Sequence, residues 1–239
     1  KISEKRDLQH ISSVTRYTDV SEPLKSFADD PLIFEPQTDW LYSSFGYRVL
    51  ACVLEGAAKS NYSDLMNRLV FEKAGMVNTL KDDAWDIIPN RVTGYRLDRQ
   101  KNVRRADIRD VSENLPAGGH LSTASDLVLF ALNLNSNTFS STKLWPEDSL
   151  PKTIGVESSW RNAIPSKELY GAGEMFFPDD SRLWVGHTGR IAGGSAIVAL
   201  QPESDVSIAV LTNSKGWNGY IGFMNKLKLI LDESSDLLE

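Results

Sequence analysis

Residues 169–212 carry the clearest structural signal in the chain, and they read LYGAGEMFFPDDSRLWVGHTGRIAGGSAIVALQPESDVSIAVLT. Runs of β-branched, aromatic and other apolar residues, which are typical of strands, occupy positions 169–177, 182–187, 194–201 and 206–212. They are separated by the turn-forming sequences Pro178-Asp179-Asp180, Gly193-Gly194 and Pro202-Glu203-Ser204-Asp205. Because these connections are too short for crossover helices, neighbouring strands are expected to be antiparallel. The sequence therefore predicts one antiparallel sheet.

Upstream of this sheet the apolar residues recur at helical spacing. We expect helices over residues 45–58, 61–73 and 122–134 and, after the sheet, over residues 220–231. Ser43 or Ser44 would cap the first helix, Gly75 would end the second, and Ser122 or Thr123 would cap the third. A further helix start is expected at Ser21-Glu22-Pro23, whereas residues 135–166 should form mostly loop.

These elements predict an α+β fold, in which an antiparallel sheet is flanked by helices and joined to a mainly helical lobe. We expect a single domain over residues 1–239. The helical lobe would span about 6–165, and the sheet with its terminal helix about 166–233. The apolar stripe of the terminal helix should cover one face of the sheet. A functional site is expected where the two parts meet.

Composition argues against several classes of function. Hydrophobic residues make up 41% of the chain and charged residues 24%, as in ordinary globular proteins, and the net charge of −6 argues against nucleic acid as a partner. No apolar run is long enough to span a membrane. His10, His120 and His187 do not lie at metal-ligand spacing, and Cys52 has no cysteine to pair with. We therefore expect no metal and no cofactor. The oligomeric state stays open.

Three segments combine residues that are suited to chemistry. His187-Thr188-Gly189 ends a predicted strand, Tyr42-Ser43-Ser44-Phe45-Gly46 lies at a loop-to-helix junction, and Leu115-Pro116-Ala117-Gly118-Gly119 leads into a helix. Each segment alone also has a structural explanation, since a tyrosine before a helix usually packs and His-Thr-Gly is a common strand-end turn. It is their joint order along the chain that indicates a site.

In that order the segments resemble the serine β-lactamase-like, or penicillin-binding-protein-like, family, which includes class C β-lactamases, D-stereospecific peptidases and esterases. The mitochondrial branch of that family is the most similar. The resemblance runs along the whole chain and rests on His10-Ile11-Ser12-Ser13-Val14, Asp30 to Pro36, Tyr42 to Tyr47, Ala74 to Thr79, Pro116 to Thr123, Tyr170 to Gly173 and Leu211 to Asn213.

The resemblance implies a β-lactamase/transpeptidase-like fold and acyl transfer by a serine hydrolase, with a small molecule or a peptide as the substrate. In the family, a Ser-x-x-Lys motif supplies the nucleophile, and a Tyr-x-Asn motif and a Lys-Thr-Gly or His-Thr-Gly strand complete the site. Tyr42 and His187 match the catalytic positions of the last two motifs. Substrate binding is expected from Ser44, Thr188, Gly189 and Arg190, with the Arg190 amide as an oxyanion donor. Ser44 replaces the asparagine of class C enzymes, which argues against efficient β-lactam turnover.

The nucleophile is the point at which the sequence departs from the family. Ser140-Ser141-Thr142-Lys143 is a literal Ser-x-x-Lys match, but it follows the tyrosine motif in a polar stretch, and Pro146 would stop the helix that places the lysine beside the serine. We therefore expect the nucleophilic serine upstream of Lys1, with the N-terminal part of the fold missing from this chain.

Two functions stay open. The first is a serine hydrolase that acts on an amide, β-lactam or ester substrate. The second is a catalytically inactive relative that serves as a binding or scaffold protein. Tyr42 together with His187-Thr188-Gly189 favours the first, because the fold alone requires neither. The family resemblance implies a periplasmic or secreted location in a bacterium and a mitochondrial one in the most similar branch.

Overall fold

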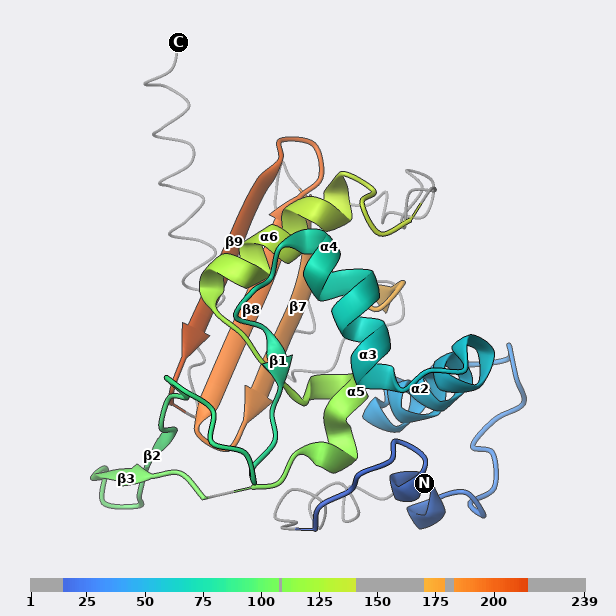
Figure 1. Ribbon diagram of the computed structural model, residues 1–239, viewed down its shortest axis with the longest axis horizontal. Coiled ribbons are helices and arrows are strands. Elements are labelled where there is room, and N and C mark those ends of the chain that lie inside the picture. Colours follow the sequence, from blue (N-terminus) through green and yellow to red (C-terminus); the bar gives the residue numbers. More distant parts are fainter. Residues whose placement is uncertain (1–14, 108, 141–169, 179–182, 215–239) are drawn as a thin grey trace.

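A computed structural model of the chain describes residues 15–107, 109–140, 170–178 and 183–214. Its main element is a five-stranded antiparallel sheet in the order β5-β6-β7-β8-β9 (Figure 1). The strands are β5 (Tyr170–Gly171), β6 (Glu174–Pro178), β7 (Leu183–Ile191), β8 (Gly194–Gln201) and β9 (Val206–Thr212). Every neighbouring pair is antiparallel, as predicted.

Two strand boundaries differ from the prediction. The run at 169–177 was expected to be one strand, but Ala172 (φ 53°) and Gly173 (φ 87°) form a tight turn that splits it into β5 and β6. Positive φ at both central residues of a two-residue loop matches the right-handed twist of a hairpin. The strand predicted to end at His187 continues to Ile191, because residues 187–191 keep pairing with β8. The segment predicted to separate the two strands was therefore too long, and the turn between β7 and β8 consists of Ala192 and Gly193.

The helices of the first half agree well with the pattern of apolar residues. Helix α2 (Ser44–Ala58) is capped by the Ser43 side chain, which accepts a hydrogen bond from Phe45 N. Residues 62–74 form one helical run, made of α3 (Tyr62–Met66), the π-helical turn η2 (Asn67–Phe71) and α4 (Glu72–Ala74), and it ends at Gly75 with φ 71°. Helix α6 (Ala124–Asn135) is capped by Thr123.

Other expectations were only partly met. The helix start at Ser21 is the short 3₁₀ helix η1 (Glu22–Ser26), and the Ser21 side chain makes no capping hydrogen bond. Residues 112–118 form the short helices η3 (Ser112–Asn114) and α5 (Leu115–Gly118). The helix predicted at 220–231 lies outside the described residues, as does most of the loop predicted at 135–166.

Two small two-stranded sheets interrupt the helical lobe and were not predicted. Strands β1 (Leu80–Lys81) and β4 (His120–Leu121) pair with each other, as do β2 (Tyr95–Leu97) and β3 (Val103–Arg105). Strands of two or three residues are too short to show an alternating pattern, so they cannot be predicted from the sequence in this way.

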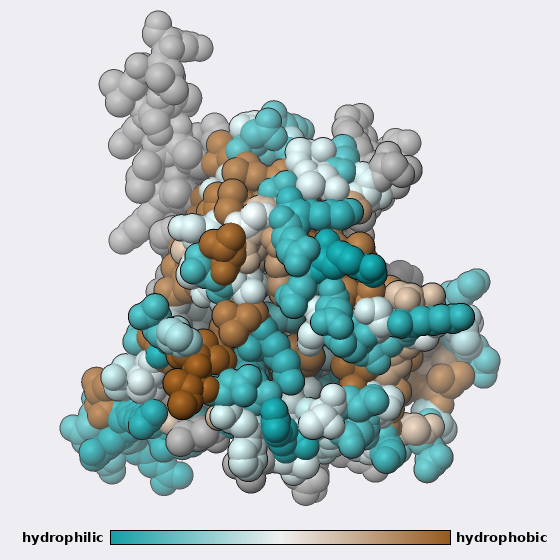
Figure 2. All heavy atoms as spheres, viewed as in Figure 1, coloured by the Kyte–Doolittle hydropathy of each residue, from teal (hydrophilic) through white to brown (hydrophobic). Residues whose placement is uncertain are grey.

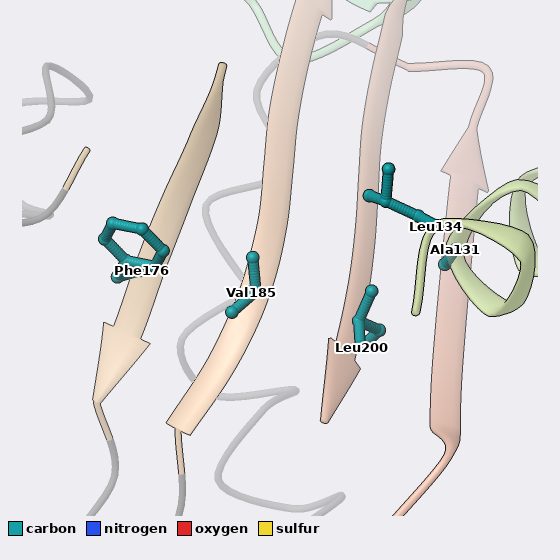
Figure 3. Close-up of a cluster of buried hydrophobic side chains, with 5 residues drawn as sticks. All are labelled: Ala131, Leu134, Phe176, Val185 and Leu200. Atoms are coloured by element: carbon teal, nitrogen blue, oxygen red, sulfur yellow. The ribbon is translucent and has the colours of Figure 1, made fainter. Parts of the chain in front are cut away.

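Helix α6 packs across β8 and β9 and joins the helical lobe to the sheet (Figure 1). Figure 3 shows the resulting core, in which Ala131 and Leu134 of the helix meet Phe176, Val185 and Leu200 of three strands. A second buried cluster contains Met175, Phe177, Trp184, Ile197 and Ala199. Alternate residues of β6, β7 and β8 therefore belong to two apolar clusters, one on each face of the sheet.

The helical lobe has its own, smaller core. Ala51 of α2, Tyr62 of α3 and Leu115 of α5 form one buried cluster, and Phe71, Ala74 and Met76 form another. The outer side of α2 stays apolar, with Val53 60% exposed and Leu50 46% exposed. Apolar and hydrophilic residues are accordingly interspersed over the surface seen in Figure 2.

Candidate active site

Tyr42 and His187, which are far apart in the sequence, lie side by side in the structure. Their ring centroids are 6.2 Å apart, and the ring planes are inclined by 31°. Tyr170 packs edge-on against both, with centroids 5.3 Å from Tyr42 and 6.0 Å from His187. The structure thus brings Tyr42 and His187 together, and their catalytic role in one shared site stays a prediction.

Tyr42 reaches this position because it directly precedes α2. Ser43 adopts an extended backbone and caps the helix, which turns the chain at the residue after Tyr42. One turn into α2, the Tyr47 hydroxyl lies 2.6 Å from the Tyr170 hydroxyl, a hydrogen bond that ties the helix to β5. Trp40 adds a further ring, 6.0 Å from that of Tyr170. We call Trp40, Tyr42, Tyr47, Tyr170 and His187 the aromatic cluster.

His187 reaches the cluster from the middle of β7. Strand β6 pairs with β7 only as far as Met175 and Gly186. Beyond that point β7 continues with β8 on its other side, and Gly189 and Ile191 are exposed. A strand that extends past its neighbour presents main-chain groups to a ligand, as in β-strand addition. The His-Thr-Gly segment therefore lies at the edge of the sheet where a substrate could align with it.

The hydrogen bond of His187 fixes which ring nitrogen is available. Nδ1 lies 2.6 Å from the Thr188 carbonyl oxygen, and since a carbonyl only accepts, Nδ1 carries the hydrogen. Burial lowers the pKa of His187, an effect that the hydrogen bond to Thr188 partly offsets. The ring is therefore neutral near pH 7, and its Nε2 is a hydrogen-bond acceptor.

Tyr42 is protonated in this environment. Burial raises the pKa of the Tyr42 phenol, and the neighbouring Tyr47 raises it further. Burial also raises the pKa of Tyr170, with smaller contributions from its Tyr47 hydrogen bond and from the charges of Tyr47, Tyr42 and Glu174. A phenol acts as a base only where a cation stabilises the phenolate. If Tyr42 accepts a proton during catalysis, a cation must therefore come from groups other than these tyrosines.

The remaining predicted site residues are placed as follows. Ser44 is the first residue of α2, half-buried next to the cap. The Thr188 hydroxyl lies 3.7 Å from the Met175 sulfur, on the face of the sheet opposite that of His187. A substrate contact by Thr188 in this conformation would thus involve its main chain. The roles of Ser44, Thr188, Gly189 and the Arg190 amide stay predictions.

The Gly118-Gly119 turn belongs to the third segment that the sequence associated with a site. Gly119 accepts a hydrogen bond from Asp82 N (2.8 Å), and the next residue, His120, packs on Phe71 with centroids 5.3 Å apart. The turn thus contacts the two-stranded β1–β4 sheet and the 62–74 helical run, and whether it also borders the aromatic cluster stays a prediction.

Several residues of the site were missed by sequence reasoning. Tyr47 and Trp40 gave no motif signal, and Tyr170 was noted only as part of the family resemblance. A second literal Ser-x-x-Lys, Ser149-Leu150-Pro151-Lys152, was also overlooked; like residues 141–143 of the first match, it lies outside the described residues.

Within the described ranges, no group of three or more His, Cys, Asp or Glu side chains is arranged to hold a metal ion. None of the described helices is both long and apolar enough to cross a membrane.

Comparison with known proteins identifies one family. The model of the Beta-lactamase family matches residues 6–232. The "Serine beta-lactamase-like protein LACTB, mitochondrial" of mouse is 29% identical over 212 residues, covering 79% of this chain and 37% of the relative. The human protein of that name is 29% identical over 209 residues, covering 76% of this chain and 36% of the relative. The chain thus spans little more than a third of these relatives.

Solved structures agree on the fold. A D-amino acid amidase from Ochrobactrum anthropi SV3, in complex with L-phenylalanine, has a TM-score of 0.74 at 19% identity, covering 96% of this chain and 68% of the amidase. A penicillin binding protein from Bacillus halodurans has a TM-score of 0.71 at 19% identity, covering 94% of this chain and 67% of that protein. The predicted α+β, β-lactamase/transpeptidase-like architecture is confirmed by these similarities.

Proposed function

The chain belongs to the Beta-lactamase family, and from that membership we propose that the protein is a serine hydrolase that acts on an amide, β-lactam or ester substrate through an acyl-enzyme. The observation that carries this proposal is the meeting of Tyr42 and His187 in the aromatic cluster. Packing alone would not require a tyrosine and a histidine at these two motif positions, one before a helix and one on the facing strand.

The proposed roles follow from the chemistry of the site. The nucleophilic serine and its lysine would come from a Ser-x-x-Lys motif outside these 239 residues. Its lysine would supply the cation that Tyr42 needs in order to accept the serine proton. The neutral His187 would accept a hydrogen bond at Nε2 from the substrate or from Tyr42. The Arg190 amide, on the segment of β7 that extends past β6, would donate to the developing oxyanion.

One observation favours the alternative, a binding protein without catalysis. Burial and Tyr47 raise the pKa of Tyr42, so the cluster by itself holds the phenol in its protonated form. A relative that lacks the Ser-x-x-Lys motif would keep the aromatic cluster as a binding surface and would catalyse no hydrolysis. Ser44, in place of the asparagine of class C enzymes, is compatible with either function.

The similarity to the mitochondrial LACTB proteins of mouse and human supports a mitochondrial location for this protein over the periplasmic or secreted alternatives. The D-amino acid amidase likewise supports a small amide substrate. The similarity to an octameric penicillin-binding protein homologue from Pyrococcus abyssi leaves the oligomeric state of this protein open.

Covalent labelling of the full-length protein with a fluorophosphonate probe tests the proposal. A hydrolase should gain one probe mass on a single serine, and peptide mapping should place that serine in a Ser-x-x-Lys motif upstream of Lys1. Tyr42→Phe should slow labelling more than tenfold, whereas Tyr95→Phe, on the exposed hairpin β2–β3, should not change it. Absence of labelling would favour the binding protein. Labelling at Ser140 or Ser149 would refute our assignment of the nucleophile.

A further inference from the structure

The hydrogen bond between Tyr47 and Tyr170 links the helical lobe to the edge of the sheet. Tyr47 lies one turn into α2, which packs on η1, α3 and α5 within the helical lobe. Tyr170 lies in β5, the edge strand of the sheet. The two hydroxyl oxygens are 2.6 Å apart. The bond therefore holds the edge of the sheet against the helix that follows Tyr42.

Strand β5 has few backbone contacts to keep it in place. It pairs with β6 over only two residues, Tyr170 and Gly171. So short a ladder is marginal by itself, because few hydrogen bonds offset the entropy cost of ordering the chain. The turn that closes this hairpin also approaches the helix, since a Cβ atom on Gly173 would lie 3.4 Å from the Tyr47 hydroxyl. The Tyr47 hydroxyl thus lies beside both the strand and its turn.

The ring of Tyr170 borders both predicted catalytic side chains. It meets Tyr42 and His187 edge-on, with an interplanar angle of 82° to each ring. The rings of Tyr42 and His187 are inclined to each other by only 31°. Because Tyr170 packs against both, a movement of its ring would change the space that is open to the Tyr42 phenol.

A hydrogen bond is suited to hold this arrangement. Burial, and after it the hydrogen bond with Tyr47, raises the pKa of Tyr170, so the hydroxyl stays protonated at neutral pH. Ring packing alone lets a side chain slide, whereas a hydrogen bond is directional and fixes the far end of the ring. Catalytic groups need such support, because a displacement on the order of 1 Å can cost about a hundredfold in rate.

We infer that Tyr47 is a positioning residue: its hydrogen bond to Tyr170 holds β5 against α2 and thereby fixes the Tyr42 phenol beside His187. The effect on catalysis rests on the proposed hydrolase function. The tether itself, which is the hydrogen bond from Tyr47 to Tyr170 and its hold on Tyr42, can be measured without turnover.

Fluorophosphonate labelling of the full-length protein tests the effect on catalysis. Tyr47→Phe and Tyr170→Phe each remove one partner of the hydrogen bond and keep the ring, and each should slow labelling about three- to tenfold. The double variant should be no slower than the slower single variant, because both changes break the same bond. Tyr62→Phe, which removes a buried hydroxyl from the core of the helical lobe, is the matched control and should leave the rate unchanged.

The Tyr42→Phe background separates positioning from a general effect on stability. Tyr47→Phe should slow labelling no further in that background, since it acts through Tyr42. A change that only weakened the fold would lower the thermal midpoint and would act equally in both backgrounds. An unchanged rate in Tyr47→Phe, multiplied losses in the double variant with Tyr170→Phe, or a further loss in the Tyr42→Phe background would overturn the positioning role.

A fluorine probe measures the tether independently of catalysis. With 3-fluorotyrosine incorporated at position 42 alone, Tyr47→Phe and Tyr170→Phe should shift or broaden its ¹⁹F resonance, whereas Tyr62→Phe should not. An unchanged resonance in Tyr47→Phe would overturn the tether. Absence of labelling in the wild type, with a resonance that still moves in Tyr47→Phe, would instead overturn only the proposed hydrolase function.

Discussion

Acid sensitivity of folding should depend on His120, a residue of β4 in the helical lobe. Its ring packs edge-on against Phe71 with centroids 5.3 Å apart and lies 6.3 Å from the ring of Tyr62. Burial lowers the pKa of His120 from 6.5 to about 4. Between these values the unfolded chain binds a proton that the native protein does not bind. His120 therefore lowers stability as the pH falls through this window, and above it has no such effect.

The magnitude follows from the two pKa values. Proton linkage gives a loss of unfolding free energy of about 1 kcal/mol at pH 5.5 and about 2–3 kcal/mol at pH 4.5, relative to neutral pH. His120→Gln removes the titrating group but keeps a polar side chain of similar length. The difference in stability between wild type and His120→Gln should therefore shift in favour of the variant by these amounts on acidification.

Urea unfolding of the full-length protein at pH 7.5, 5.5 and 4.5, followed by tryptophan fluorescence, measures this difference. Other carboxylates and histidines titrate in both proteins, so their contributions cancel when the two are compared at each pH. Parallel pH profiles for the two proteins would show that His120 protonates freely in the native state. That result would refute the burial argument for this part of the lobe.

The other predictions concern the site and the packing of the sheet. Tyr42→Phe should lower turnover of the complete enzyme more than tenfold with an unchanged thermal midpoint, since only one hydroxyl is lost; His187→Ala should weaken turnover or binding and leave residual activity. Gly186→Ala should destabilise the fold by more than about 2 kcal/mol in urea unfolding, because a methyl group there overlaps the backbone of β8. Asp126 is 2% exposed and accepts 2.8 Å hydrogen bonds from Asn78 N and from the Thr79 hydroxyl, so Asp126→Ala should cost about 2–3 kcal/mol in the same assay. An unchanged unfolding midpoint for either core variant would contradict the packing described here.

Local patterns were sufficient to predict most of the regular elements. Helix α2 has its apolar residues at helical spacing and a serine at its cap, and β8 and β9 are continuous apolar runs between turn sequences. Such signals are short-range, because backbone hydrogen bonding and burial of one face repeat with a period that a single segment displays. Tyr42 and His187 were found in the same way, since each lies in a short motif whose order along the chain resembles one family.

The environment of those two residues was decided by tertiary structure alone. The 2.6 Å hydrogen bond between Tyr47 and Tyr170 joins residues 123 positions apart, and nothing in either local sequence indicates the other partner. The 3.7 Å contact between the Thr188 hydroxyl and the Met175 sulfur likewise follows from the register of β6 and β7, because the pairing of two strands depends on a core assembled from distant segments. The pKa shifts of Tyr42 and His187 have burial as their main cause, and burial is a property of the packed molecule that no short stretch of sequence contains.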